Sequence, residues 1–269
     1  MEEKKKVILT GLIFFLVAIL GVAIYYFFFQ RGKDAPTGEI TEQPPAQAPL
    51  EESLMEREKE LLDLAQVELD KSDELVRNLA KELSSHPKLA AWLISKDLIR
   101  KFTAGVDNIA NGLSPNPQID FFSIKEDFKV LKREGLYYLD PENYHRYDLV
   151  ADVFLSLDTE GCVKLYRQLK PLVQDAYRDL GYPAEDFQKT LVRAIEELLN
   201  VPVVERDILV EKKIVTYMMS DSRLENLNEA QKHLLRMGPE NVHIIQEKLR
   251  EMAAGLEIPR ERLPQPKTY

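Results

Sequence analysis

Residues 234–249, LLRMGPENVHIIQEKL, decide how the C-terminal part of this chain folds. An apolar run ends at Gly238 and Pro239, and a second amphipathic run starts immediately after them. Glycine is favoured just past the end of a helix, and proline suits the first position of the next helix. The stretch therefore predicts a corner between two packed helices, one over roughly 222–237 and one over roughly 239–254.

The same stretch has the general shape of a helix-turn-helix, so DNA reading must be weighed against the structural corner. A recognition helix needs cationic and amide side chains near its N-terminus, where this one offers Pro239, Glu240 and Asn241. The whole chain carries a formal charge of −9, and an acidic protein is repelled by phosphate backbones and by anionic lipid. We therefore expect no nucleic-acid partner.

Upstream of the corner, apolar residues recur at helical spacing through most of residues 70–200. Two short β-prone runs around Arg133, Glu134 and Gly135 predict a small hairpin, and residues 201–219 are extended enough to add to it. The predicted fold class is mainly α: a multi-helix, bundle-like domain with a small β-hairpin.

Short polar residues and prolines mark the starts of the predicted helices, because their side chains or fixed backbone angles satisfy the first turn. The predicted starts are Ser72, Ser95, Asp140 with Pro141, Asp158, Pro183, and Asn228 with Gln231 as a capping box.

The N-terminal part of the chain predicts a membrane anchor. VILTGLIFFLVAILGVAIYYFFF is 23 residues without a charge, and about 20 apolar residues span a bilayer core as a helix. No small-x-small cleavage site follows, so an uncleaved anchor is favoured over a signal peptide. The predicted organisation is a cytoplasmic tail (1–6), the transmembrane helix (7–29), a disordered Pro-rich linker (30–50), a stalk helix (51–69), a helical soluble domain (70–255) and a flexible tail (256–269).

Basic residues on the two sides of the span indicate its direction. Lys4, Lys5 and Lys6 precede it and only Arg31 and Lys33 follow it, and the more basic flank stays in the cytoplasm. We therefore expect the soluble domain on the exported side. The opposite orientation would make it a cytoplasmic-facing regulator.

The residue types that usually carry catalysis form no recognisable motif. The sequence has no Walker A loop, no GxGxxG, no HExxH and no GxSxG. The histidines His86, His145, His233 and His243 are too far apart for a local zinc site, and Cys162 has no histidine fixed near it in sequence. We therefore predict no catalytic residue, no metal site and no cofactor.

Polar side chains within apolar helices are the candidates for a binding site. Arginine and tyrosine combine a large contact area with polar tips, which suits a groove for a peptide, a glycan or an acidic ligand. Ion pairs and caps that fix how the helices meet are the alternative, and the one we favour. Arg236 would bond the last carbonyls of its own helix or pair with an acid such as Asp107. The candidate set is Arg100, Asp107, Asn108, Tyr144, Arg146, Tyr147, Arg236, Glu240 and Asn241.

Four blocks of the sequence resemble successive blocks of a bacterial family, the domain of unknown function 3014 family. The blocks are WLISKDLIRKFTAGVDNIANG (92–112), LDPENYHRYD (139–148), LKPLVQDAYRDLGYP (169–183) and QKHLLRMGPEN (231–241). The resemblance covers roughly residues 70–254. It implies a protein of the Gram-negative cell envelope, with an N-terminal span, a Pro-rich linker and one C-terminal domain. It implies no catalytic residues.

Together these observations predict a single-pass protein of the bacterial inner membrane with a periplasmic helical domain. The predicted function is a non-enzymatic, membrane-tethered binding or scaffold module of the cell envelope. Its partner would be an envelope protein or a cell-wall component, in addition to the inner membrane that holds residues 7–29. The alternative is an envelope enzyme with a dispersed site around Arg100, Asp107, Arg146 and Arg236, which requires these groups to converge in one pocket.

Overall fold

The computed structural model of the protein describes residues 67–115 and 128–269. The predicted span (7–29), the linker (30–50) and most of the stalk helix (51–69) lie outside these residues. Within the two described ranges, no helix is both long enough and apolar enough to cross a membrane.

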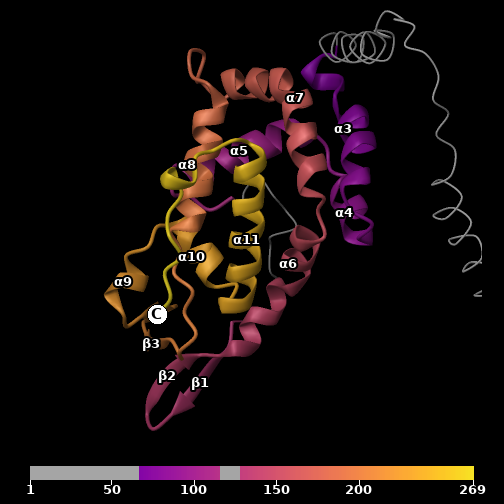
Figure 1. Cartoon of the computed structure of the whole chain (residues 1–269). Coiled ribbons are helices and arrows are strands. Elements are labelled where there is room, and N and C mark those ends of the chain that lie inside the picture. Colours follow the sequence, from indigo (N-terminus) through magenta and orange to yellow (C-terminus); the bar gives the residue numbers. More distant parts are fainter. Residues whose placement is uncertain (1–66, 116–127) are drawn as a thin grey trace, which may run out of the picture. The chain divides into compact units, whose positions relative to one another are not determined.

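The described residues form a mainly helical domain with one small antiparallel sheet (Figure 1), which confirms the coarse fold class predicted from the sequence. The α-helices are α3 (Asp73–Ala80), α4 (Pro87–Trp92), α5 (Leu98–Ala110), α6 (Asp148–Leu155), α7 (Thr159–Asp179), α8 (Phe187–Leu199), α9 (Ser222–Glu225), α10 (Glu229–Leu235) and α11 (Pro239–Gly255). Short 3-10 helices are η2 (Leu69–Lys71), η3 (Lys81–Leu83), η5 (Pro141–Tyr147) and η6 (Arg260–Arg262).

The sheet contains the predicted hairpin and two further strands from the extended segment that follows α8. Its strands, in spatial order, are β1 (Val130–Arg133), β2 (Leu136–Leu139), β3 (Leu209–Lys212) and β4 (Tyr217–Met219), and all neighbours are antiparallel. Tyr137 on β2 lies opposite Val210 on β3. Because of this register, the β1–β2 turn and the β3–β4 turn lie at the same end of the sheet.

Two apolar clusters make up the core, and α8 contributes to both. One cluster packs α8, α10 and α11 against the inner face of the sheet, and includes Ile195, Leu199 and Val210. The other joins α3, α5, α7 and the start of α8, and includes Tyr177 and Phe187. In Figure 1, α11 lies between α8 and α6, and it contacts α6, α7 and α8. The sheet therefore lies at one end of the domain, away from α5 and α7.

The corner predicted at Gly238 and Pro239 is present, but the helix before it is shorter than predicted. α10 ends at Leu235, and Gly238 has a φ of +86° immediately before α11 begins at Pro239. The single helix expected over 222–237 is instead two helices, α9 and α10.

A capping box explains why α10 starts where it does. The Asn228 side chain accepts a hydrogen bond from the Gln231 backbone N–H at 2.9 Å. The Gln231 side chain accepts one in return from the Asn228 N–H at 3.3 Å, which confirms the predicted capping box. Since this arrangement satisfies the first backbone donors of a new helix, the chain restarts at this point rather than continuing α9.

Of the other helix starts predicted from the sequence, some are confirmed by the structure and some are wrong. Asp140 and Asp158 accept backbone N–H bonds at the starts of η5 and α7, as predicted, although η5 is a 3-10 helix. α8 begins at Phe187 behind a cap by Asp186, four residues later than the start predicted from Pro183. α5 begins at Leu98, so the predicted cap at Ser95 is wrong.

The C-terminal residues 256–269, predicted to be a flexible tail, pack on the domain instead. Ile258 and Leu263 are each only 7% exposed. The Val203 backbone N–H donates to the Lys267 carbonyl at 2.7 Å, and Val203 pairs with Thr268 in a parallel bridge. Burial of these two apolar side chains offsets the loss of chain entropy, which a Pro- and Arg-rich composition does not reveal.

Candidate functional site

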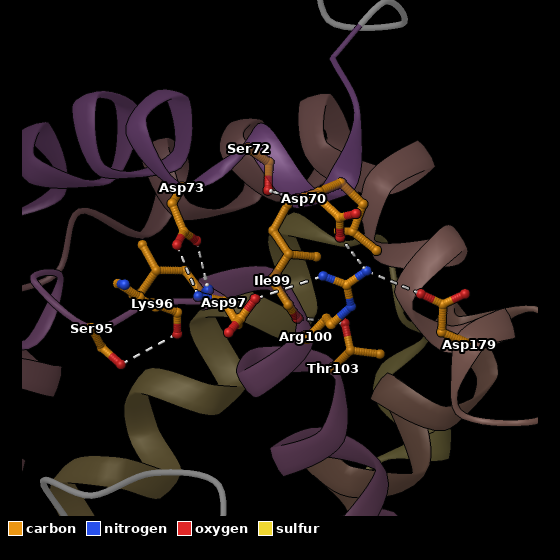
Figure 2. Close-up of polar contacts among 12 residues, drawn as sticks. Asp70, Ser72, Asp73, Ser95, Lys96, Asp97, Ile99, Arg100, Thr103 and Asp179 are labelled. Atoms are coloured by element: carbon orange, nitrogen blue, oxygen red, sulfur yellow. Dashed lines mark hydrogen bonds and ion pairs between the residues drawn. The ribbon is translucent and has the colours of Figure 1, made fainter.

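Arg100 lies on the first turn of α5 and joins three elements (Figure 2). Its guanidinium is 2.7 Å from a carboxylate oxygen of Asp70 in η2, 3.3 Å from one of Asp179 at the end of α7, and 3.7 Å from one of Asp97. The hydrogen bond with Asp70 contributes most to raising the pKa of Arg100 above its ordinary value. With its charge shared among three carboxylates, Arg100 holds elements together rather than offering a cation to a ligand.

Asp107 and Asn108 lie two turns further along α5, in different contacts. Asp107 accepts hydrogen bonds from the Asn111 amide at 3.1 Å and from the Tyr182 hydroxyl at 3.4 Å, and burial raises the pKa of its carboxyl. The Asn108 amide donates to the Ser114 carbonyl at 3.5 Å. Asp107 thus connects the end of α5 to the α7–α8 loop, and Asn108 connects it to the segment that follows α5.

At the helix corner, Asn241 is buried and connects α11 to η5 and to the first residue of α6. Its amide nitrogen lies 2.9 Å from the Met237 carbonyl, 2.9 Å from an Asp148 carboxylate oxygen and 3.4 Å from the Tyr144 carbonyl. The Tyr144 ring packs directly on Gly238. These contacts are what hold η5 against the corner.

The remaining four candidates surround the same corner. The Arg146 side chain donates to the Asn143 carbonyl at 3.0 Å and lies 5.9 Å from the centre of the Tyr147 ring, and Tyr147 is buried. Arg236 and Glu240 are exposed at the end of α10 and the start of α11. Within the described ranges the Arg236 side chain forms neither a hydrogen bond nor an ion pair, so neither of the two partners predicted for it is present; its backbone N–H donates to the Lys232 carbonyl at 3.1 Å.

The nine candidates therefore fall into two groups: three along α5 and six around the α10–α11 corner. Arg100 and Arg236, which the dispersed-enzyme alternative needs in one pocket, belong to different groups. Among the described residues, no cluster of three or more histidine, cysteine or acidic side chains could hold a metal ion.

The structure contains a candidate binding surface that was not predicted from the sequence. It lies where the two hairpin turns meet. We name it the hairpin end, and define it as residues 132–136 and 211–216. Ile214 and Val215 form the tip of the β3–β4 hairpin and are 99% and 94% exposed. Leu136 beside them is 49% exposed, and Met218 on the outer face of β4 is 39% exposed.

Exposed apolar side chains gain none of the stabilisation that burial would give them. Single surface apolar residues are common, but these four lie on adjoining strands and turns of one sheet end. Full burial of an isoleucine or a valine side chain contributes roughly 1.5–3 kcal/mol. The hairpin end therefore has the properties of a surface that something else covers.

The hairpin end is basic within an acidic protein. Its four cations are Lys132, Arg133, Lys212 and Lys213 and its two acids are Glu134 and Glu211, so four minus two gives +2, against −9 for the chain. Arg133 pairs with Asp207 at 2.7 Å, and Lys213 pairs with Glu211 at 2.9 Å. Both ion pairs are exposed and therefore weak, which leaves the lysines able to face a new partner.

A sequence signal for this surface exists in the residues of the turn. The Lys213 N–H donates to the Thr216 carbonyl at 2.8 Å, so Ile214 and Val215 are the central residues of the turn. Tight hairpin turns favour glycine, asparagine and aspartate, and β-branched residues there gain nothing from turn geometry. An Ile-Val pair between two strands, directly after two lysines, is therefore unusual enough to mark an interaction surface.

Fold and surface together define a helical domain with a small sheet that presents two hairpin turns to its surroundings. The chain belongs to the family described as "Protein of unknown function (DUF3014)", whose model matches residues 98–253. This confirms the family predicted from the sequence, and the match includes both hairpins and the helix corner. No curated protein and no solved structure matches the chain.

Proposed function

We propose that the protein is a membrane-tethered, non-enzymatic binding or scaffold module of the bacterial cell envelope, and that the hairpin end is its contact surface. The observation that carries the proposal is the nearly complete exposure of Ile214 and Val215 at the tip of a hairpin. Association buries apolar surface, and that burial is the main favourable term in most protein associations.

The internal contacts of the polar candidates support a binding role over a dispersed active site. Arg100 is shared by three aspartates, and Asn241 is buried with three oxygen acceptors within 3.4 Å of its amide nitrogen. Groups bound in this way hold the scaffold rigid. A rigid helical scaffold beneath two hairpins suits the presentation of a fixed surface to a partner.

The tether is the second part of the proposal. Residues 7–29 provide a span of bilayer length, and residues 30–50 provide a Pro-rich spacer. The predicted orientation places the domain in the periplasm of a cell whose inner membrane holds the anchor. A domain held in this way meets its partner at the membrane surface.

In-cell photo-crosslinking of the full chain tests the contact surface. A photoreactive amino acid is placed at Val215 in one variant and, as the control, at Ile94, which is 73% exposed in the loop between α4 and α5. We expect position 215 to give a defined adduct, identified by mass spectrometry, at several times the yield of position 94. Equal yields at the two positions, or no adduct at either, would remove the basis of the proposal.

A further inference from the structure

We infer that the hairpin end binds the surface of an anionic phospholipid bilayer, with Ile214 and Val215 entering the interfacial layer and Lys212 and Lys213 facing the headgroups. The inference rests on the proposed function, because it names the partner of the same surface.

The shape of the tip points to a soft, extended partner. Ile214 and Val215 are 99% and 94% exposed, so they project from the turn into the solvent. Elements that bind bilayers from one side insert apolar side chains to the depth of the headgroup and acyl boundary and keep lysine or arginine at the phosphates. Lysine suits this position because its aliphatic stem stays in apolar surroundings while its ammonium reaches the headgroups.

The composition of the tip separates a bilayer from a protein partner. Cores of protein interfaces are enriched in aromatic residues, methionine and arginine and are depleted in lysine. Energetic hot spots of such interfaces also contain little valine. The tip is Lys212, Lys213, Ile214 and Val215, which is the reverse of that pattern and matches a lipid-facing turn.

Aromatic rings behind the tip brace the two hairpins against each other. The Tyr217 ring centre is 6.0 Å from that of Tyr137 on β2 and 5.8 Å from that of Phe128, just before β1. Lys132 lies 5.7 Å from the centre of the Tyr137 ring. Both turns are thus held in one fixed arrangement, so docking costs little conformational entropy at the hairpin end.

The charge distribution explains how an acidic protein could approach an anionic surface. The hairpin end carries +2 while the whole chain carries −9, so the chain as a whole is repelled by an anionic surface and the hairpin end is attracted to it. The attraction acts within a Debye length, about 8 Å at physiological salt. The net charge therefore disfavours adhesion of the body and at the same time orients the domain with its hairpins toward the lipid.

Because the chain is anchored to the membrane, even a weak contact between the hairpin end and the bilayer is enough to favour the docked state. Two apolar side chains and two lysines resemble a single acyl anchor in strength, with an association constant on the order of 10⁴ M⁻¹. A domain connected to the same membrane by a short flexible linker has an effective concentration of about 1 mM. The product of this association constant and this effective concentration is about 10. The docked state is therefore favoured for the anchored protein and would be weakly populated for a free domain.

The test uses the full-length protein in vesicles, with Cys162→Ser to remove the single native cysteine. Val215→Cys carries an environment-sensitive fluorophore, and nitroxide-labelled lipids quench it when it lies at the bilayer surface. The vesicles are phosphatidylcholine with or without phosphatidylglycerol. Ile94→Cys, another exposed apolar position, is the matched control site.

We expect strong quenching at position 215 in vesicles with phosphatidylglycerol, weak quenching in phosphatidylcholine alone, and weak quenching at position 94 in both. High salt should reduce the signal at position 215. Lys212→Glu with Lys213→Glu should lower the ratio of docked to undocked protein by roughly 30-fold or more, about fivefold for each lysine removed. Both lysines are exposed, so this double variant should fold normally.

The outcomes separate this inference from the proposed function. Absent quenching at position 215, or equal quenching at positions 215 and 94, overturns lipid docking through the hairpin end. Equal quenching in the two lipid compositions overturns the requirement for anionic lipid. If position 215 is not quenched but crosslinks to a protein in cells, the proposed function stands and the partner is that protein. If it gives neither signal, both fail.

Discussion

Gly238 occupies a backbone conformation that no other residue adopts readily. Its φ of +86° and ψ of 163° lie in a region that is almost exclusive to glycine. A Cβ atom at this position would lie 2.4 Å from Cγ of Tyr144, far inside van der Waals contact. The residue therefore permits the turn between α10 and α11 and also the close approach of η5.

Gly238→Ala should destabilise the domain by more than about 3 kcal/mol, since backbone strain of roughly 1–3 kcal/mol adds to the clash with Tyr144. Gly181→Ala is the matched control, because Gly181 also has a positive φ, +105°, but a Cβ there meets nothing within 4 Å. Urea unfolding of detergent-solubilised protein, followed by the fluorescence of the single tryptophan, Trp92, measures both. Equal losses in the two variants would show that the Tyr144 contact contributes nothing.

Local residue patterns were predictable at this corner, and the environments of its side chains were not. Asn228 and Gln231 are three residues apart, so their capping box is visible in the sequence. Arg236 was expected to bond a carbonyl or an acid, yet it is exposed and without either contact in the described part of the chain. Whether a side chain is buried depends on elements distant in sequence, which a helical period does not place.

At the scale of elements, α10 packs against η5 through a histidine and a tyrosine. The His233 and Tyr147 rings meet edge to face, with centres 6.1 Å apart. Burial, with the charge of Arg236 adding to it, lowers the pKa of His233 from 6.5 to about 4. The folded state therefore holds this imidazole neutral at pH values where an unfolded chain would protonate it.

This shift makes the α10–η5 contact sensitive to acid. Because the pKa of His233 is lowered in the folded state, the free energy of unfolding is highest above pH 6.5. It decreases as the pH falls from 6.5 toward 4, where the unfolded chain binds a proton that the folded protein does not. The loss from this one group is at most about 3 kcal/mol. His233→Phe keeps the ring contact and should flatten the pH dependence of the unfolding free energy in that window.

The comparison is between wild type and His233→Phe at matched pH, because carboxylates also titrate in this range and should cancel. His243→Phe on α11 is a control for the loss of any histidine, since His243 is exposed. Parallel pH profiles for wild type and His233→Phe would rule out this histidine as the source.

The start of α7 was predictable because its cap is local, and the start of α5 was not, because its cap comes from another helix. Asp158 caps its own helix α7 and was identified correctly. α5 is capped instead by Asp73 of α3, whose carboxylate accepts the backbone N–H groups of Asp97 and Leu98 at 2.8 and 2.9 Å (Figure 2). A donor and an acceptor 24 residues apart produce no local sequence pattern, whereas Ser95 lies close to the start of the apolar helical pattern.

At the scale of the whole molecule, the distribution of charge matters more than its sum. The total of −9 is read directly from the sequence, and it predicts repulsion from lipid and nucleic acid. The +2 of the hairpin end exists only because the pairing of β2 with β3 brings residues 132–136 beside residues 211–216. That juxtaposition spans about 75 residues of chain and was outside the reach of sequence patterns, as was the candidate surface that it creates.

The orientation of the chain in the membrane remains a prediction, and the structure identifies which positions are accessible enough to test it. Cys162 is a poor reporter because burial raises the pKa of its thiol to about 11 and limits access. In a Cys162→Ser background, Ile94→Cys, at a position 73% exposed, should react with a membrane-impermeant thiol reagent in intact spheroplasts. Glu3→Cys, before the predicted span, should react only after lysis, because it leaves in place the three lysines on that flank, which favour the cytoplasm. The reverse pattern would place the domain in the cytoplasm as a regulator, and would direct its hairpin end to the inner leaflet.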